Sequence, residues 1–178
     1  GARAHLRPAP GVGVIDLYCG YGASLREWTE SGSAALGVEL SGEAVELAAV
    51  NAPRAKVLRG TCMQRLPQLR DWWNSLGGER VAYVNPPRSG LEAGVAGALA
   101  HELRPSRLAY LSCSAGTLAR DLAILAAAGY RVAAIRPYDF FPLTHHVEAL
   151  ALLEIDAGVG MLNSGPATTT AQPTDGVA

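Results

Sequence analysis

The sequence has few cysteines and no long apolar run, and each of these absences excludes a class of protein. The three cysteines form no CxxC pair and no metal-ligand spacing, so neither a disulfide framework nor a zinc site is indicated. No apolar run reaches the ~20 residues that a membrane-spanning helix needs, and residues 1–10 lack the apolar core of a signal peptide. We therefore expect a cytoplasmic protein without a metal ion or a membrane segment.

The chain also lacks a strong net charge. Its formal charge of −1 does not by itself indicate a nucleic-acid binder, because such proteins usually carry a surplus of Lys and Arg. Hydrophobic residues make up 49% of the chain and charged residues 17%, which excludes disorder over most of its length and favours a sheet buried on both faces.

The length of 178 residues favours one folded domain. Pro8 and Pro10 indicate that residues 1–10 are a linker or the remnant of a truncation, which leaves residues 11–156 as the domain. Residues 157–178 are rich in Gly, Ser, Thr, Pro and Ala, and we expect them to be a disordered tail.

Short apolar runs alternate with helical patterns from Val12 onward. This alternation is typical of βαβ units and predicts a Rossmann-like α/β fold, with a mostly parallel, twisted sheet and helices on both faces. The expected strands are 12–18, 34–40, 56–59, 81–84, 108–112, 131–137 and 147–155, and the expected helices are 23–30, 42–51, 91–103 and 117–128, with a mixed segment at 60–76.

The first predicted strand runs into the loop DLYCGYG, which contains Asp16, Tyr18, Gly20 and Gly22. Ligands bind beyond the carboxyl ends of strands in such sheets, and glycines let the backbone come close to them. The second strand ends at Glu39, where a carboxylate can accept hydrogen bonds from both ribose hydroxyls. The loop lacks the GxGxxG spacing that cradles a pyrophosphate, so we predict an adenosine-containing ligand. In the alternative, the glycines only make a tight turn and Glu39 is a surface charge.

The motif NPPRSG, residues 85–90, follows the strand expected at 81–84. Its two prolines fix an extended backbone, so Asn85 should be held rigidly at the carboxyl edge of the sheet. An amide both donates and accepts hydrogen bonds, which suits the edge of a flipped nucleobase.

Cys113 lies in the motif LSCSAGTLARDL, between a predicted strand and a predicted helix. The positive end of the helix dipole favours a thiolate there, which makes Cys113 a candidate nucleophile. A lone cysteine is more often buried filler, and we interpret Cys19 in that way. Glu148 ends the motif DFFPLTHHVE among apolar neighbours, an environment that would suit its carboxyl group for proton transfer.

These four motifs occur in the order and spacing typical of RNA uracil-C5 methyltransferases, and residues 12–155 resemble the catalytic domain of that family. The resemblance implies a class I methyltransferase fold with an antiparallel last strand, S-adenosylmethionine as cofactor, and tRNA or rRNA as partner. It implies a cofactor site made by the first loop, the second strand and the motif NPPRSG, with Asp16, Tyr18, Gly20, Gly22, Glu39 and Asn85 as its residues.

The resemblance also implies a covalent mechanism. Cys113 would add to C6 of uracil and Glu148 would remove the C5 proton, while Asn85, Arg88 and His146 would contact the substrate. Covalent addition splits one difficult step into two easier ones.

The chain departs from the family pattern in ways that keep two alternatives open. It has Asn85 where the family usually has Asp, Thr61 where it usually has an acidic residue, and Ser114-Ala115 in place of Asn-Pro. Asn-Pro-Pro also occurs in enzymes that methylate amino nitrogens, which is the first alternative. The second is a catalytically weak, truncated domain that binds only cofactor or RNA.

Overall fold

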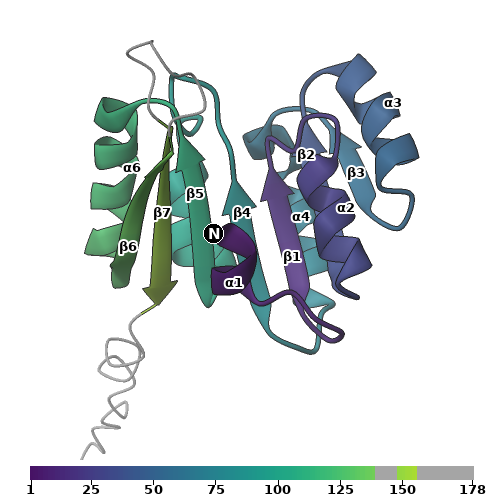
Figure 1. Cartoon of the computed structure of the whole chain (residues 1–178), viewed down its shortest axis with the longest axis horizontal. Coiled ribbons are helices and arrows are strands. Elements are labelled where there is room, and N and C mark those ends of the chain that lie inside the picture. The colour runs from purple at the N-terminus through teal and green to yellow at the C-terminus, as the bar shows by residue number, and fades with distance from the viewer. Residues whose placement is uncertain (139–147, 156–178) are drawn as a thin grey trace, which may run out of the picture.

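The computed structural model describes residues 1–138 and 148–155. Within these residues the chain forms a seven-stranded sheet in the order β3-β2-β1-β4-β5-β7-β6 (Figure 1). The strands β1 to β5 pair in parallel, whereas β7 is antiparallel to both of its neighbours, β5 and β6. The predicted Rossmann-like sheet with an antiparallel last strand is thus confirmed. The strands are β1 Gly13–Leu17, β2 Ala34–Glu39, β3 Lys56–Arg59, β4 Arg80–Val84, β5 Arg107–Ser112, β6 Tyr130–Tyr138 and β7 Glu148–Ile155.

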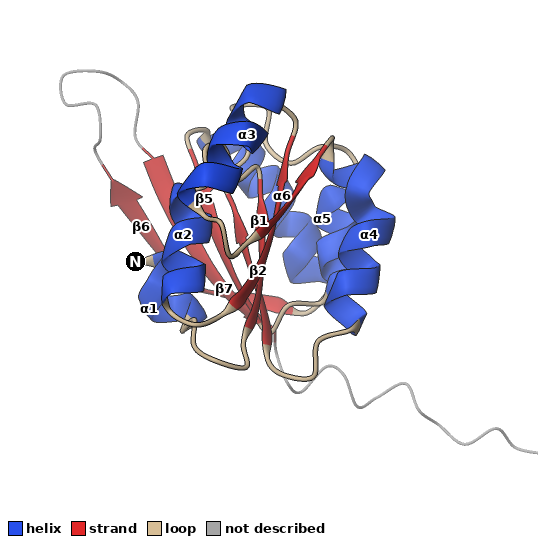
Figure 2. Cartoon of the chain, turned by 90° about the vertical axis from the view of Figure 1, so that its right-hand side faces the viewer, coloured by secondary structure: helices blue, strands red, loops and turns tan. Residues whose placement is uncertain are grey.

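Helices cover both faces of the sheet (Figure 2). One face carries α1 Ala2–Leu6, α2 Ala23–Glu30 and α3 Gly42–Asn51, and the other carries α4 Cys62–Asn74, α5 Val95–Gly97, the π-helix η1 Ala98–Leu103 and α6 Ala115–Ala127. The bounds of α2 and α3 are those predicted from the sequence.

A hydrophobic core lies on each side of the sheet. Leu25 and Trp28 of α2 are buried in one, and Leu69 and Trp73 of α4 are buried in the other. All five residues of β1 are buried, so this interior strand has no face toward water. Burial on both faces explains the high apolar content of the chain. It also means that the interior strands are accessible to a ligand only at their ends.

Residues 1–10 differ from the expected linker, because they contain α1. Leu6 is fully buried, and its carbonyl accepts a hydrogen bond from Arg107 Nη2 at 2.9 Å. His5 Nε2 donates to the carbonyl of Leu153 at 2.9 Å. Pro8 and Pro10 follow this helix and prevent its continuation. The sequence pattern therefore predicted a linker at this place.

The segment expected to be mixed, residues 60–76, is mostly the helix α4. Thr61 caps it by accepting a hydrogen bond from the Gln64 N–H, and the Gln64 side chain accepts one from the Thr61 N–H. Pro67 lies inside the helix and interrupts the sequence pattern, whereas the buried side chains of Leu69 and Trp73 stabilise it by packing. The helix expected at 91–103 begins later, at Val95, and continues as η1.

Two of the predictions lie outside the described residues, namely the disordered tail at 157–178 and the position of His146. In the part of the chain that is described, no helix is both long and apolar enough to cross a membrane.

Candidate active site

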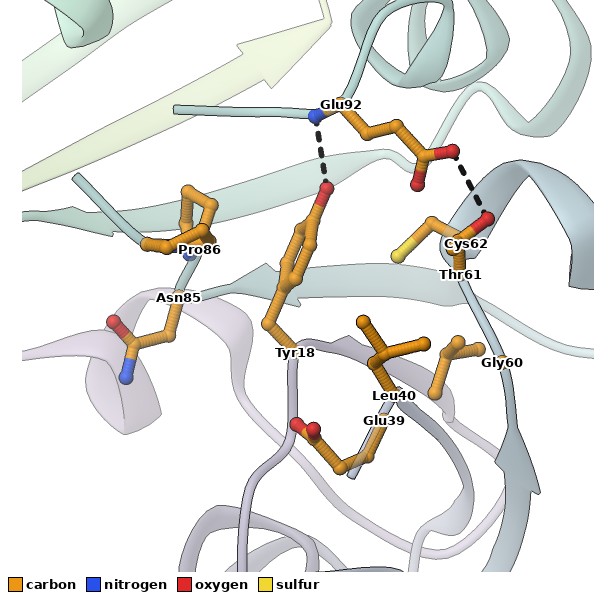
Figure 3. A pocket seen from close by; sticks show the side chains of 11 residues that line it. Tyr18, Glu39, Leu40, Gly60, Thr61, Cys62, Asn85, Pro86 and Glu92 are labelled. Carbon is orange, nitrogen blue, oxygen red and sulfur yellow. Dashed lines mark hydrogen bonds between the residues drawn. The ribbon is translucent and has the colours of Figure 1, made fainter. Parts of the chain in front are cut away.

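A cavity of about 430 Å³ opens at the carboxyl edge of the parallel strands. This volume is within the usual range for small-molecule sites, and the edge is where α/β sheets bind ligands. Its wall is made by residues at the carboxyl end of β2 and by residues that follow β1, β2, β3 and β4, namely Tyr18, Val38, Glu39, Leu40, Gly60, Thr61, Cys62, Asn85, Pro86, Pro87 and Glu92 (Figure 3).

Glu39 is held in place by two backbone N–H groups. Its Oε2 accepts a hydrogen bond from Gly20 at 3.0 Å, and its Oε1 accepts one from Ser41 at 2.8 Å. A carboxylate has about four acceptor positions, so the fixed Glu39 can still accept hydrogen bonds from a ligand. Leu40, next to it, is 63% exposed and offers an apolar surface in the same wall. An acceptor beside an apolar surface suits the ribose and base of a nucleoside.

Tyr18 connects the glycine loop with the opposite wall of the cavity. Its backbone has a φ of 63°, a left-handed conformation that is uncommon for a residue with a side chain. Its hydroxyl accepts a hydrogen bond from the Glu92 N–H at 3.0 Å, and Glu92 Oε1 accepts one from Thr61 Oγ1 at 2.9 Å (Figure 3). Glu92 is a site residue that the sequence analysis missed, because it lies in an irregular loop 74 positions from Tyr18.

Cys62 also lines the cavity, but its environment keeps it unreactive. It is buried, and burial raises the pKa of its thiol to about 12. Burial likewise raises the pKa of the Cys19 thiol well above its usual value, in agreement with its interpretation as filler. Neither thiol therefore ionises near neutral pH, and both are poor nucleophiles.

Three predicted cofactor residues lie outside the cavity wall. Asp16 is fully buried, and its Oδ2 accepts a hydrogen bond from Trp28 Nε1 at 2.8 Å; burial raises its pKa to about 7. Gly22 caps α2 with a φ of 84°, and a Cβ there would lie 3.0 Å from the Cα of Ala48 in α3. Gly20 contributes only its backbone N–H, which donates a hydrogen bond to Glu39 Oε2. These residues shape the loop, whereas Tyr18, Glu39 and Asn85 line the cavity itself.

Cys113 and Glu148 lie at the same edge of the sheet. In the antiparallel pairing of β5 with β7, Ser112 is opposite Ala149. Cys113 follows Ser112 and Glu148 precedes Ala149. Both residues therefore lie at the carboxyl end of β5, which is the edge of the sheet at which the cavity opens. Cys113 is partly exposed, as a group that attacks a substrate must be. Neither residue lines the cavity, so this pair makes a second, adjacent part of the candidate site.

A network around Asp121 joins the two parts. Asp121 Oδ2 accepts hydrogen bonds from the Tyr110 hydroxyl at 2.7 Å and from the Leu91 N–H at 2.9 Å. Arg120 contacts Asp121 Oδ1 at 2.8 Å and donates to the Leu91 carbonyl at 3.2 Å. The loop after β4, which carries Asn85 and the exposed Arg88, is thereby fastened to α6, the helix that begins just beyond Cys113.

Over residues 1–138 and 148–155, no three His, Cys, Asp or Glu side chains are grouped so that they could hold a metal ion.

Solved structures share this fold. An S-adenosylmethionine-dependent methyltransferase from Mesorhizobium loti matches with a TM-score of 0.61 over 85% of this chain and 94% of its own, at 15% identity. The tRNA (uracil-54, C5)-methyltransferase of Pyrococcus abyssi, solved with S-adenosyl-L-homocysteine, matches with a TM-score of 0.67 at 27% identity, over 85% of this chain and 36% of its own. The fold is that of the Rossmann-like class I methyltransferases.

The family is identified from the sequence comparisons. Residues 74–156 match the family model described as tRNA (Uracil-5-)-methyltransferase. An RNA methyltransferase of unassigned role from Gloeobacter violaceus is 38% identical over 146 residues, which is 79% of this chain and 30% of that protein. A similar one from Geobacter sulfurreducens is 38% identical over 147 residues, 79% of this chain and 28% of its own. Residues 74–156 are thus similar to the tRNA (uracil-5-)-methyltransferase family, which confirms the resemblance seen in the motifs. The chain spans about 30% of the length of these relatives.

Proposed function

We propose that this domain transfers a methyl group from S-adenosylmethionine to C5 of a uridine in tRNA or rRNA. The observation that carries the proposal is the register of β5 and β7, which brings Cys113 and Glu148 to one edge of the sheet, next to a cavity of nucleoside size. The S-adenosyl-L-homocysteine bound by the Pyrococcus abyssi enzyme supports the choice of cofactor.

The cavity wall fits this cofactor. Glu39 offers acceptors for the ribose hydroxyls, Leu40 and Pro86 offer apolar contacts for the base, and Asn85 offers an amide at the cavity's edge. When bound, the cofactor supplies the electrophilic methyl group. The residues of the chain must do the rest, which is to activate and deprotonate the uracil.

Cys113 and Glu148 are the two residues assigned to activate and deprotonate the uracil. The Cys113 thiolate adds to C6 of the uracil, and the electron pair of the C5–C6 bond makes C5 nucleophilic, so that it takes the methyl group. Glu148 then accepts the proton of C5, the electrons of the C5–H bond restore the double bond, and the C6–S bond breaks to release Cys113 as thiolate. Asn85, Arg88 and His146 are assigned to hold the base and the RNA.

Release of the C5 hydrogen distinguishes this reaction from methylation of a nitrogen or an oxygen. RNA carrying tritium at C5 of its uridines is incubated with the full chain, with and without S-adenosylmethionine. We expect at least one tritium to be released for each methyl group transferred. Methyl transfer without release of tritium would contradict the proposal, and so would failure of saturating RNA to accept any methyl group.

A further inference from the structure

Glu92 joins two walls of the cavity. It lies in the loop after β4, where its carboxylate accepts the Thr61 hydroxyl 31 positions away in the chain, while its N–H donates to the Tyr18 hydroxyl (Figure 3). One bond fixes its side chain and the other fixes its backbone. Glu92 is therefore a partly buried carboxylate held in the wall of the cavity.

Among its described residues, the wall of the cavity has two carboxylates and no cationic side chain. Among the described residues of its wall, Glu39 and Glu92 are acidic and none is Lys, Arg or His. Such a wall favours a ligand that presents hydrogen-bond donors in two places, and it disfavours a phosphate or another anion. A carboxylate is an acceptor only, so what each of the two offers to a ligand is its remaining acceptor positions.

The adenosine part of the proposed cofactor has donors in two such places. The ribose hydroxyls are one pair, and they are assigned to Glu39. The other is the exocyclic amine of the adenine ring. From Glu39, the wall continues through Leu40 at the end of β2 to Thr61 and Cys62 after β3, where the Glu92 carboxylate lies. Thr61 engages Oε1, and across residues 1–138 and 148–155 no hydrogen bond to Oε2 is found.

We propose that Glu92 accepts a hydrogen bond from the adenine amine and selects adenine over other purines, with Thr61 as the residue that orients it. This inference rests on the proposed function, since it takes the cofactor to occupy the cavity. The acidic group that contacts the base would then be Glu92, in the loop after β4. The loop after β3 supplies only the neutral Thr61 at this place.

A ratio of two affinities tests this role. S-adenosylhomocysteine and its 6-deamino analogue, in which purine replaces adenine, are titrated by calorimetry into the full-length wild type, Glu92→Ala and Glu92→Gln. Glu46→Ala is the matched control, because Glu46 is exposed on α3 and lies outside the cavity wall. A loss of folding or of loop order weakens both ligands alike, so only a residue that contacts the amine changes the ratio.

We expect the wild type and Glu46→Ala to bind S-adenosylhomocysteine at least about tenfold more tightly than the analogue, as for a hydrogen bond to a charged acceptor. The ratio should fall to about twofold in Glu92→Ala and lie between these values in Glu92→Gln. If the wild type binds S-adenosylhomocysteine but the ratio is the same in all four proteins, the role of Glu92 is wrong and the proposed function is unaffected. If the wild type binds neither compound, the proposed function fails as well.

Discussion

The Tyr110 hydroxyl donates a hydrogen bond of 2.7 Å to Oδ2 of Asp121, and both side chains are buried between β5 and α6. Burial and this hydrogen bond raise the pKa of Tyr110 well above its usual value, so the hydroxyl remains a donor. The same oxygen of Asp121 accepts the Leu91 N–H. One carboxylate thus holds together the strand that leads to Cys113, the helix that follows it and the loop after β4.

Replacing Asp121 should destabilise the domain strongly. Asp121→Ala leaves the Tyr110 hydroxyl and the Leu91 N–H buried without an acceptor, and each such group costs about 1–3 kcal/mol. We expect the free energy of unfolding in urea to fall by about 3–5 kcal/mol. Tyr110→Phe is the matched control, because it removes one donor and leaves Asp121 with other partners, so its cost should be about 1 kcal/mol. Equal losses in the two variants would show that Asp121 does not join the three elements.

Loss of Glu39 should weaken cofactor binding. Glu39→Ala removes a fixed, charged acceptor, so we expect the affinity for S-adenosylmethionine to fall by about 1.5–3 kcal/mol in calorimetry. The melting temperature without ligand reports any loosening of the loop that Glu39 holds through Gly20. Glu46→Ala serves again as the control. An affinity equal to that of the wild type would remove Glu39 from the site.

Asp16 should make the protein less stable as the pH rises. Its pKa is raised by burial from 3.8 to about 7 in the folded protein, so between these values the folded state keeps a proton that the unfolded state releases. The free energy of unfolding should therefore decrease from about pH 4 to about pH 7, by up to about 1.4 kcal/mol per pH unit, and level off above that range.

The variant Asp16→Asn isolates this contribution, because its side chain does not titrate. Urea denaturation of both proteins from pH 4 to pH 8 should give a difference that grows in favour of the variant up to about pH 7. Parallel curves over the whole range would mean that the pKa of Asp16 is not raised in the folded protein.

The sequence predicts most elements of this fold, and the exceptions have identifiable causes. The helices α2 and α3 were predicted at their observed bounds because each lies between two strands of the alternating pattern. The helix α4 was missed because Pro67 interrupts its pattern, although Thr61 and Gln64 form the spacing of a capping box. The helix α1 was missed because two prolines follow so short a segment. Its presence is explained by the burial of Leu6 and by the hydrogen bonds that Leu6 and His5 make with the sheet.

The candidate site could be predicted only where a residue lies next to a strand end. Tyr18, Glu39 and Asn85 directly follow or end strands, so the order of strands brings them together at one edge. Asp16 belongs to the same motif, yet it lies within β1 and points into the core, where Trp28 binds it. Glu92 could not be found, because its place in the cavity depends on long-range contacts with Tyr18 and Thr61 that no local pattern encodes.

Variants of Cys113 and Glu148 should stop the reaction at two different steps. Cys113→Ala has no nucleophile and should form no covalent bond to RNA and transfer no methyl group. Glu148→Gln keeps the nucleophile but cannot accept the C5 proton, so it should transfer the methyl group and then remain attached to the RNA. Cys19→Ala is the control, since Cys19 is a buried thiol outside the cavity wall and should behave as the wild type does.

The most direct measurement is a single-turnover reaction of Glu148→Gln with ordinary uridine RNA and methyl-labelled S-adenosylmethionine, followed by denaturing gel electrophoresis. The account predicts a labelled protein–RNA species that resists denaturation. The double variant that carries both Glu148→Gln and Cys113→Ala should not form this species. Methylated RNA formed by Cys113→Ala alone, or the complete absence of the attached species from Glu148→Gln at saturating RNA, would contradict it.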